Sequence, residues 1–150
     1  MRRMPTTLLA LTILVSLAGL AAAGDLVWRS HAEALPEAAR TGKPVIIHFT
    51  ADWCSWCTKM KKETYTDPAV ARLMTEDFIT AMVDSDDNPL LNWIYGVQSL
   101  PTIWIVDSDG QGITKIAGFR DARAFAKQLE WVASKAYLTQ SFNAYANLGQ

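Results

Sequence analysis

The feature that most constrains this chain is a pair of cysteines that follows a buried-type strand and begins a helix. Val45–Thr50 is rich in β-branched residues and nearly all apolar, which is typical of a strand covered on both faces at the centre of an α/β sheet. Trp53-Cys54-Ser55-Trp56-Cys57 follows almost at once, and residues 54–64 have a helical pattern. A C-x-x-C pair between a strand and a helix is typical of dithiol–disulfide exchange.

Cys54 and Cys57 are the only cysteines among the 150 residues, so they cannot form a disulfide framework. A bridge between residues three apart closes a very small loop, and the stabilisation from loop closure grows with loop length. The pair is better suited to reversible chemistry, with Cys54 as the attacking thiolate and Cys57 as the resolving thiol. The unsatisfied N–H groups of a helix N-terminus are expected to lower the pKa of Cys54 below about 8.5.

Three other uses of this pair compete with exchange. A structural zinc site takes four ligands, whereas the chain holds two cysteines and two histidines, His31 and His48, without the spacing of a zinc finger. Two thiolates suit copper(I), a soft ion, and a pair of inert buried cysteines is the plainest alternative. For the exchange reaction we expect no metal and no dissociable cofactor, because the redox equivalents reside in the two sulfur atoms.

Residues 1–23 have the three-part pattern of a secretory signal peptide. Arg2 and Arg3 give a positive start, and the 16 residues of Leu8–Ala23 are predominantly apolar and end in three alanines. A membrane span needs roughly 20 residues, so we expect cleavage rather than a permanent anchor. The predicted organisation is a signal peptide at 1–23, one domain at 24–138 and a C-terminal tail at 139–150, exported to a bacterial periplasm.

Composition restricts the class of protein further. Half of the residues are hydrophobic, which excludes a disordered chain, and the formal net charge of −1 offers no basic surface for nucleic acid. Without residues 1–23 the chain keeps 12 basic and 15 acidic residues, a net charge of −3. The remaining 127 residues are enough for one compact domain with its own core.

The pattern of these residues predicts the order β-α-β-α-α-β-α-β-β-α, and therefore an α/β fold with a central mixed sheet flanked by helices. The final two strands are joined by a tight turn, which makes them antiparallel. The predicted strands are 26–28, 45–50, 78–83, 102–106 and 112–117; the predicted helices are 30–40, 54–64, 87–95, one capped by Asp67 that buries Val70, Leu73 and Met74, and one capped by Asp121 that buries Phe125, Leu129, Val132 and Ala136.

Between about Leu26 and Leu138 the chain resembles the thioredoxin-like superfamily. The residues that carry the resemblance are the segment from Lys43 to Cys57, then Val83-Asp84, Leu100-Pro101-Thr102 and Gly118. Ala51-Asp52-Trp53-Cys54, with Thr66-Asp67-Pro68-Ala69-Val70 downstream, is most similar to the C-terminal periplasmic domain of the electron-relay protein DsbD and to small exported relatives of that domain. The resemblance implies a thioredoxin-like fold.

The resemblance also implies a substrate site around the cysteines. Pro101 would be a cis-proline against the active-site disulfide, and Leu100 and Pro101 would offer backbone groups to an extended substrate segment. Trp53 and Trp56 flank the nucleophile. Packing and substrate contact are equally good interpretations of Trp53, whereas Trp56, between the cysteines, is expected to be partly exposed.

Two positions depart from the family pattern. Thioredoxins and DsbD-type domains carry a buried acidic residue six positions before the first cysteine, where this chain has His48, and Thr80 stands where thioredoxins often have a lysine. One hypothesis is that His48 relays the proton of the resolving thiol, because its unperturbed pKa of about 6.5 suits transfer near neutrality. The alternative is a hydrogen-bonded core histidine, which burial keeps neutral.

The sequence thus predicts a monomeric periplasmic thiol–disulfide oxidoreductase that reduces the disulfides of exported proteins. Its partners are expected to be protein thiols and disulfides, together with a membrane redox protein that supplies electrons, and not nucleic acid. An oxidant of exported thiols is the first alternative. A copper(I)-thiolate carrier and a non-catalytic thioredoxin-like binding module are alternatives from other classes.

Overall fold

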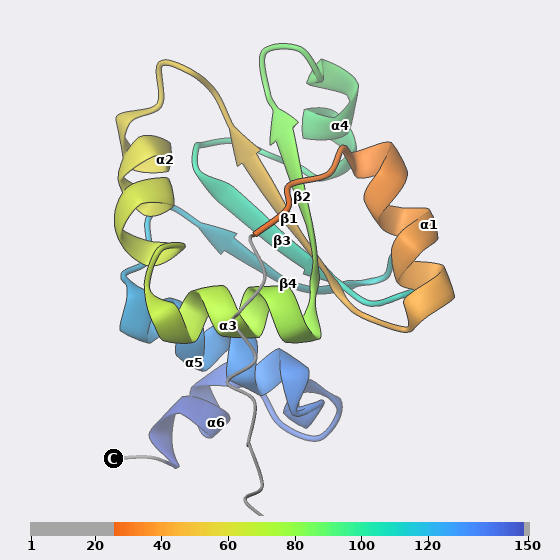
Figure 1. The fold of residues 1–150 in the computed structure, drawn as a ribbon, viewed down its shortest axis with the longest axis vertical. Coiled ribbons are helices and arrows are strands. Elements are labelled where there is room, and N and C mark those ends of the chain that lie inside the picture. The colour runs from red at the N-terminus through yellow and green to blue at the C-terminus, as the bar shows by residue number, and fades with distance from the viewer. Residues whose placement is uncertain (1–25, 149–150) are drawn as a thin grey trace, which may run out of the picture.

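A computed structural model describes residues 26–148, so the predicted signal peptide at 1–23 lies outside the described residues. Its centre is a four-stranded sheet in the order β2-β1-β3-β4, with β1 at Val45–Thr50, β2 at Ile79–Asp84, β3 at Thr102–Val106 and β4 at Gly112–Ala117. Strands β1 and β2 run parallel, and the other two pairs are antiparallel (Figure 1). This confirms the predicted α/β fold with a mixed sheet.

Helices cover both faces of the sheet. The helical elements are α1 (His31–Thr41), α2 (Ser55–Lys59), α3 (Pro68–Asp77), α4 (Pro89–Ile94), α5 (Ala122–Ala133) and α6 (Phe142–Asn147), with a π-helical turn at Met60–Thr64 and a 3-10 turn at Ala136–Leu138. Helix α1 packs against β1 and β2, whereas α3 and α5 pack against each other below the opposite face (Figure 1). Among residues 26–148, no helix is both long and apolar enough to cross a bilayer.

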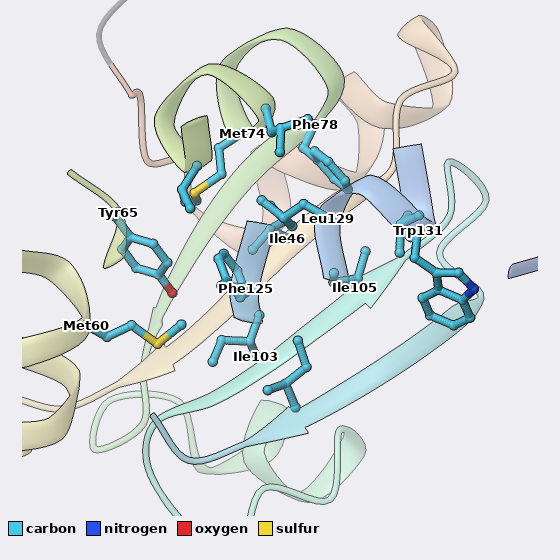
Figure 2. Close-up of a cluster of buried hydrophobic side chains, with 14 residues drawn as sticks. Ile46, Met60, Tyr65, Met74, Phe78, Ile103, Ile105, Phe125, Leu129 and Trp131 are labelled. Carbon is cyan, nitrogen blue, oxygen red and sulfur yellow. The ribbon is translucent and has the colours of Figure 1, made fainter. Parts of the chain in front are cut away.

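The sheet is buried because alternate residues of β1 serve two cores. Ile46 joins a large cluster with α3 and α5, and Figure 2 shows it beside Phe125 and Leu129 of α5. Val45, Ile47 and Phe49 point to the other face, where they pack with α1. All six residues of β1 are buried, as expected for a central strand without polar alternation.

Local side-chain bonds begin the helices where the sequence predicts. The Asp67 carboxylate accepts the backbone N–H groups of Ala69 and Val70 at the start of α3, and Asp121 accepts that of Ala124 in α5. Such caps are each worth about 1 kcal/mol. The buried residues of α3 are the predicted Val70, Leu73 and Met74, and those of α5 include the predicted Phe125, Leu129 and Val132, while Ala136 lies beyond its end and is only partly buried.

The structure corrects several predicted boundaries. Residues 26–28 do not form a strand, because only Arg29 bridges the sheet, through its partner Ala81. The single helix predicted over 54–64 divides into α2 and the π-helical turn, in which the Tyr65 N–H bonds to the Met60 carbonyl at 3.1 Å. The predicted strand at 78–83 lies one residue later, and the helix at 87–95 is shortened to α4.

The segment 139–150 is predicted as a tail, and its described part contains α6. This short helix is capped by Ser141 and is held to α5 by an edge-to-face contact between Phe142 and Trp131, whose ring centroids are 5.7 Å apart. The Trp131 indole N–H also donates to the Gln140 carbonyl at 3.1 Å. An uncharged segment without clear periodicity thus folds because a tryptophan outside it supplies the packing surface.

Candidate active site

Cys54 and Cys57 form a disulfide at the N-terminus of α2. The S–S distance is 2.14 Å and the two Cα atoms are 5.3 Å apart. Cys54 is the N-cap of α2, and its Sγ accepts the backbone N–H of Cys57 at 3.1 Å. A donor at this position stabilises negative charge on the Cys54 sulfur when the pair is reduced. Cys54 keeps 5% of its surface exposed whereas Cys57 keeps none, so Cys54 is the more exposed of the two residues.

The end of β1 places the pair at one edge of the sheet. The chain leaves β1 at Thr50, and a tight turn, in which the Cys54 N–H donates to the Ala51 carbonyl at 3.1 Å, leads into α2. Because β1 and β2 are parallel, β2 ends at the same edge, where the Ser85 N–H bonds to the Thr50 carbonyl at 2.8 Å. The loops after both strands therefore lie beside the cysteines.

Pro101 follows a cis peptide bond, as the family resemblance implies. Its carbonyl accepts the N–H of Gly118 at 2.8 Å, and Gly118 has a positive φ of +84°, a conformation that suits glycine. Together with Trp56, Leu100 and Phe119, these residues line an open groove on the surface. The structure thus brings Trp56, Leu100 and Pro101, three residues predicted for substrate contact, to one place.

The wall of this groove is attached to the cysteine helix. The Trp56 ring packs on that of Phe119 at 5.6 Å, and the Lys59 ammonium lies 5.4 Å from the Phe119 ring centroid. At the far end of the π-helical turn, the buried Thr64 hydroxyl donates to the Arg120 carbonyl at 2.6 Å. The 118–120 segment and the helix that carries Cys57 are therefore held together at both ends.

Trp53, the residue before Cys54, is not among the residues that line this groove and is largely exposed. Its indole N–H donates to the Asp86 carboxylate at 2.9 Å, which connects the active-site turn to the loop after β2. The Asp84 carboxylate in turn accepts the Asp86 N–H at 2.9 Å. The predicted packing role for Trp53 does not describe this position, because the ring buries little of its surface.

His48 is completely buried in β1 and bonds through Nδ1 to the Tyr65 hydroxyl. The Trp28 and Tyr65 rings pack around it, at centroid distances of 6.1 Å and 5.4 Å. Burial, reinforced by the positive charge of Lys61, lowers the pKa of His48 to about 3, so the imidazole is neutral near pH 7. Nε2 is buried without a hydrogen-bond partner.

Tyr65 is the functional candidate that the sequence reasoning missed. Its ring lies in the large core cluster shown in Figure 2, and burial raises the pKa of its hydroxyl well above the usual value. The only signal in the sequence is the histidine at position 48, where the family has an acid, because a buried histidine needs a hydrogen-bond partner. Thr80, the other departure from the family pattern, donates its hydroxyl to the Val27 carbonyl at 2.6 Å and so has a structural partner.

Polar side chains near this edge do not gather into a metal site. Among residues 26–148, no three His, Cys, Asp or Glu side chains come together in a way that could hold a metal ion. His31, for example, lies apart from His48 and pairs through Nε2 with the Tyr95 hydroxyl at 2.8 Å.

A strand that delivers two cysteines to a helix start, where they pack on Leu100 before the cis peptide bond to Pro101, defines the class of thiol–disulfide oxidoreductases built on the thioredoxin fold. The chain belongs to the thioredoxin-like family, because the family model of the thioredoxin-like domain matches residues 31–133. Membership confirms the resemblance found in the sequence and the activity class expected from the C-x-x-C pair.

Comparison with known proteins supports this membership. The chain is 35% identical over 103 residues to the thiol:disulfide interchange protein DsbD of Escherichia coli K12, a match that covers 65% of this chain but only 18% of DsbD. DsbD of Yersinia pestis is 35% identical over 96 residues, 59% of this chain and 16% of that protein. The chain thus spans less than a fifth of these relatives.

Solved structures give the same fold. A thioredoxin from Thermus thermophilus has a TM-score of 0.66 at 28% identity and covers 73% of this chain and 88% of its own. The DsbH oxidoreductase also has a TM-score of 0.66, with 24% identity, and covers 84% of this chain and 96% of its own. The second likeness is one of fold alone.

Proposed function

We propose that this protein is a periplasmic reductant of disulfides in exported proteins and that it receives electrons from a membrane redox protein. The observation that carries the exchange reaction is the asymmetry of the cysteine pair: Cys54 is the more exposed cysteine and accepts an N–H bond, whereas Cys57 is fully buried. The similarity to DsbD, a thiol:disulfide interchange protein, supports the choice of protein disulfides as substrates.

The exchange has two steps, which together transfer two electrons from the cysteine pair to the substrate disulfide. The Cys54 thiolate attacks one sulfur of a substrate disulfide; the substrate S–S bond breaks, a mixed disulfide forms, and the departing substrate thiolate takes up a proton. Cys57 then loses its proton and attacks the Cys54 sulfur, which releases the second substrate thiolate to be protonated. Two electrons pass from the cysteine pair to the substrate, and the pair ends as the disulfide seen here.

We also propose that a substrate chain lies in the groove beside the cysteines. Leu100 and Pro101 would present their backbone to an extended segment of that chain, in the manner of strand addition. Trp56 and Phe119 form the apolar wall on the same groove. An alanine substitution at Trp56 should raise KM for a protein disulfide but leave reduction of a small neutral disulfide unchanged; equal effects on both would contradict substrate contact.

For the proton of Cys57 we propose a relay through His48. The imidazole is neutral, its Nδ1 faces the Tyr65 hydroxyl and its Nε2 has no partner, so the ring can accept at one nitrogen and donate at the other. Because burial lowers the pKa of His48 to about 3, the imidazole is a weak base, and the relay requires it to donate one proton to the Tyr65 oxygen as it accepts another at Nε2. In His48→Ala the pH profile of exchange should shift; an unchanged profile would leave His48 as a core histidine only.

The direction of electron flow is tested by the reduction potential of the pair. Equilibration with glutathione, followed by the fluorescence of the adjacent tryptophans, should give a value near that of thioredoxin, about −270 mV. A value near about −120 mV would make the protein an oxidant instead. Absence of insulin-type disulfide reduction, combined with tight stoichiometric copper(I) binding, would favour the carrier.

The periplasmic location is tested separately from the chemistry. Fusion of residues 1–23 to a reporter enzyme that is active only after export should give activity in the periplasmic fraction, and mass spectrometry should show cleavage after the alanines at 21–23. Reporter activity confined to the cytoplasm would remove this part of the proposal without affecting the exchange activity.

A further inference from the structure

Helix α4 has apolar side chains on both of its faces. Leu91 and Tyr95 face inward and pack on the smaller core beside α1. Trp93 and Ile94 lie three and four residues after Leu90, which makes both of them neighbours of Leu90 on one outward stripe, and Leu90, Trp93 and Ile94 are 67%, 79% and 57% exposed. An exposed tryptophan between two exposed aliphatic residues is an unusual surface for a helix with no buried residue of its own.

This stripe adjoins the active site. Helix α4 follows the loop after β2, and the Asp86 carboxylate in that loop holds the indole N–H of Trp53, the residue before Cys54. Figure 1 shows α4 at the same end of the sheet as the loop that leads into α2. Eight large hydrophobic residues of the described chain are exposed, and five of them lie either on α4 or beside the cysteines: Trp53, Trp56, Leu90, Trp93 and Ile94.

The N-terminal border of the stripe is acidic. Asp84, Asp86 and Asp87 precede α4, whereas the Lys115 ammonium of β4 donates to the Gly96 carbonyl beyond the other end of the helix. Within residues 26–148 the ion pairs involve other residues, namely Arg29–Glu37, Lys59–Glu63 and Arg72–Glu76. The carboxylates of this loop are therefore not neutralised by a neighbouring cation in the described structure.

We propose that the α4 docking face, made of Trp53, Asp86, Asp87, Leu90, Trp93 and Ile94, binds a protein segment that carries an apolar side chain flanked by lysine or arginine. The apolar side chain packs on Trp93, and the cations pair with the carboxylates at the start of the helix. The proposal rests on the proposed function, because docking here would hold a redox partner or substrate beside Cys54.

The negative charge of this face favours a basic protein segment over a membrane or a second copy of the chain. Anionic lipid headgroups attract basic surfaces, so a membrane would be repelled by Asp86 and Asp87. A two-fold pairing of two copies through this face would bring the same carboxylates together, which is unfavourable. A segment with an apolar side chain between basic residues matches both parts of the face: the apolar side chain packs on the stripe, and the basic residues pair with the carboxylates.

The test compares two probe peptides with the full chain in its reduced form. Both peptides have one disulfide and one leucine; the leucine is flanked by lysines in the first and by glutamates in the second. At low salt the lysine peptide should be reduced about tenfold faster, and the difference should largely vanish at 1 M salt, where the screening length is about 3 Å. Trp93→Ser should slow reduction of the lysine peptide at least about fivefold.

Matched variants separate this face from general effects. Asp87→Lys should reverse the preference between the peptides, whereas Asp109→Lys, an exposed carboxylate in the turn between β3 and β4, should not. Leu138→Ser, which changes a residue that is 69% exposed on the 3-10 turn, is the control for Trp93→Ser. The two control variants, Asp109→Lys and Leu138→Ser, should reduce neutral hydroxyethyl disulfide at the rate of the unchanged protein.

A second measurement does not depend on the redox reaction. A labelled lysine peptide without cysteine should bind the oxidised protein by fluorescence anisotropy, and Trp93→Ser should weaken its binding. Equal rates for both peptides and no effect of Trp93→Ser would overturn the docking proposal while hydroxyethyl disulfide reduction kept the proposed function. If no disulfide were reduced, the proposed function would fail and the anisotropy alone would decide the docking proposal. Binding to vesicles of phosphatidylglycerol, not to the peptide, would also overturn it.

Discussion

The two sides of the disulfide differ in what their aromatic residues do. On the buried side, Tyr65 and Trp28 enclose His48, and every contact is internal. On the exposed side, Trp53 and Trp56 leave most of their ring surface to solvent. The aromatic residues of the two groups thus have different environments: one group encloses a buried neutral histidine, and the other is exposed to solvent. Substitutions on the two sides should therefore alter different measured quantities.

The largest expected effect is the loss of disulfide exchange when one of the two cysteines is substituted. Cys54→Ser removes the accessible nucleophile and should reduce the rate of disulfide exchange by roughly a thousandfold or more. Cys57→Ser keeps the first attack and should accumulate a mixed disulfide through Cys54, detectable by mass spectrometry. Trapping by Cys54→Ser in place of Cys57→Ser would invert the assigned roles.

The next effect concerns the buried side and depends on pH. The pKa of His48 is lowered from 6.5 to about 3, so the native state takes up fewer protons than the unfolded state below pH 6.5. Its contribution to stability is complete above pH 6.5 and is lost as the pH falls toward 3. Each pKa unit is worth about 1.4 kcal/mol, so the free energy of unfolding should drop by about 2 kcal/mol between pH 6.5 and 5.

The expected pH dependence is checked by measuring the free energy of unfolding with denaturant at several pH values, in the unchanged protein and in two histidine variants. His48→Gln should flatten the dependence on pH. His31→Asn is the control, because the pKa of His31 is also lowered by burial but the residue is only partly buried. A dependence that disappears in His31→Asn and persists in His48→Gln would show that the wrong histidine was assigned.

A smaller effect is expected from the hydroxyl that faces His48. Tyr65→Phe leaves both ring nitrogens of the buried imidazole without a partner and should lower the free energy of unfolding by about 1–3 kcal/mol. Tyr137→Phe, in a partly buried ring that contacts Trp131, is the matched control and should change it by less than about 0.5 kcal/mol. Equal losses would mean that the His48–Tyr65 bond adds no stability.

The smallest expected change in stability is on the exposed side. Trp53→Phe removes the indole bond to Asp86 but changes little buried surface, so unfolding should shift by less than about 0.5 kcal/mol. Trp104→Phe loses a partly buried indole bond to the Tyr95 carbonyl and should cost about 1–2 kcal/mol. Thermal unfolding of the two variants compares them; a greater loss for Trp53→Phe would erase the distinction between the two sides.

Much of the fold is readable in the sequence because its signals are local. Several elements can be predicted from a few neighbouring residues. Examples are the apolar run of β1, the helix caps at Asp67 and Asp121, and the tight turn before β4. The prediction of a strand at 26–28 is wrong, because an apolar triplet does not indicate which residue bonds to the sheet. The bonds are made by Arg29, with the backbone of Thr80 and Met82. Likewise, α6 depends on a distant tryptophan.

The candidate site is predictable to the same degree. The cysteines are found from their spacing, and Pro101 from the family resemblance. Tyr65 was missed because its partner is 17 residues away, and only the π-helical turn and the packing of α3 and α5 determine that its hydroxyl meets His48. The α4 docking face was missed for a related reason: exposure of Trp93 is a property of the folded surface, not of its neighbours in sequence.

The attachment of the groove wall to the cysteine helix has a consequence for the cost of binding. Trp56 contacts Phe119, Thr64 bonds to the Arg120 carbonyl, and the Pro101 carbonyl accepts the Gly118 N–H, so the residues that line the groove are linked to one another before anything binds. A groove whose shape is already set gives up little conformational entropy when it is occupied. Most of the conformational entropy lost on binding is therefore that of the bound chain, about 1–2 kcal/mol for each of its backbone residues that becomes ordered.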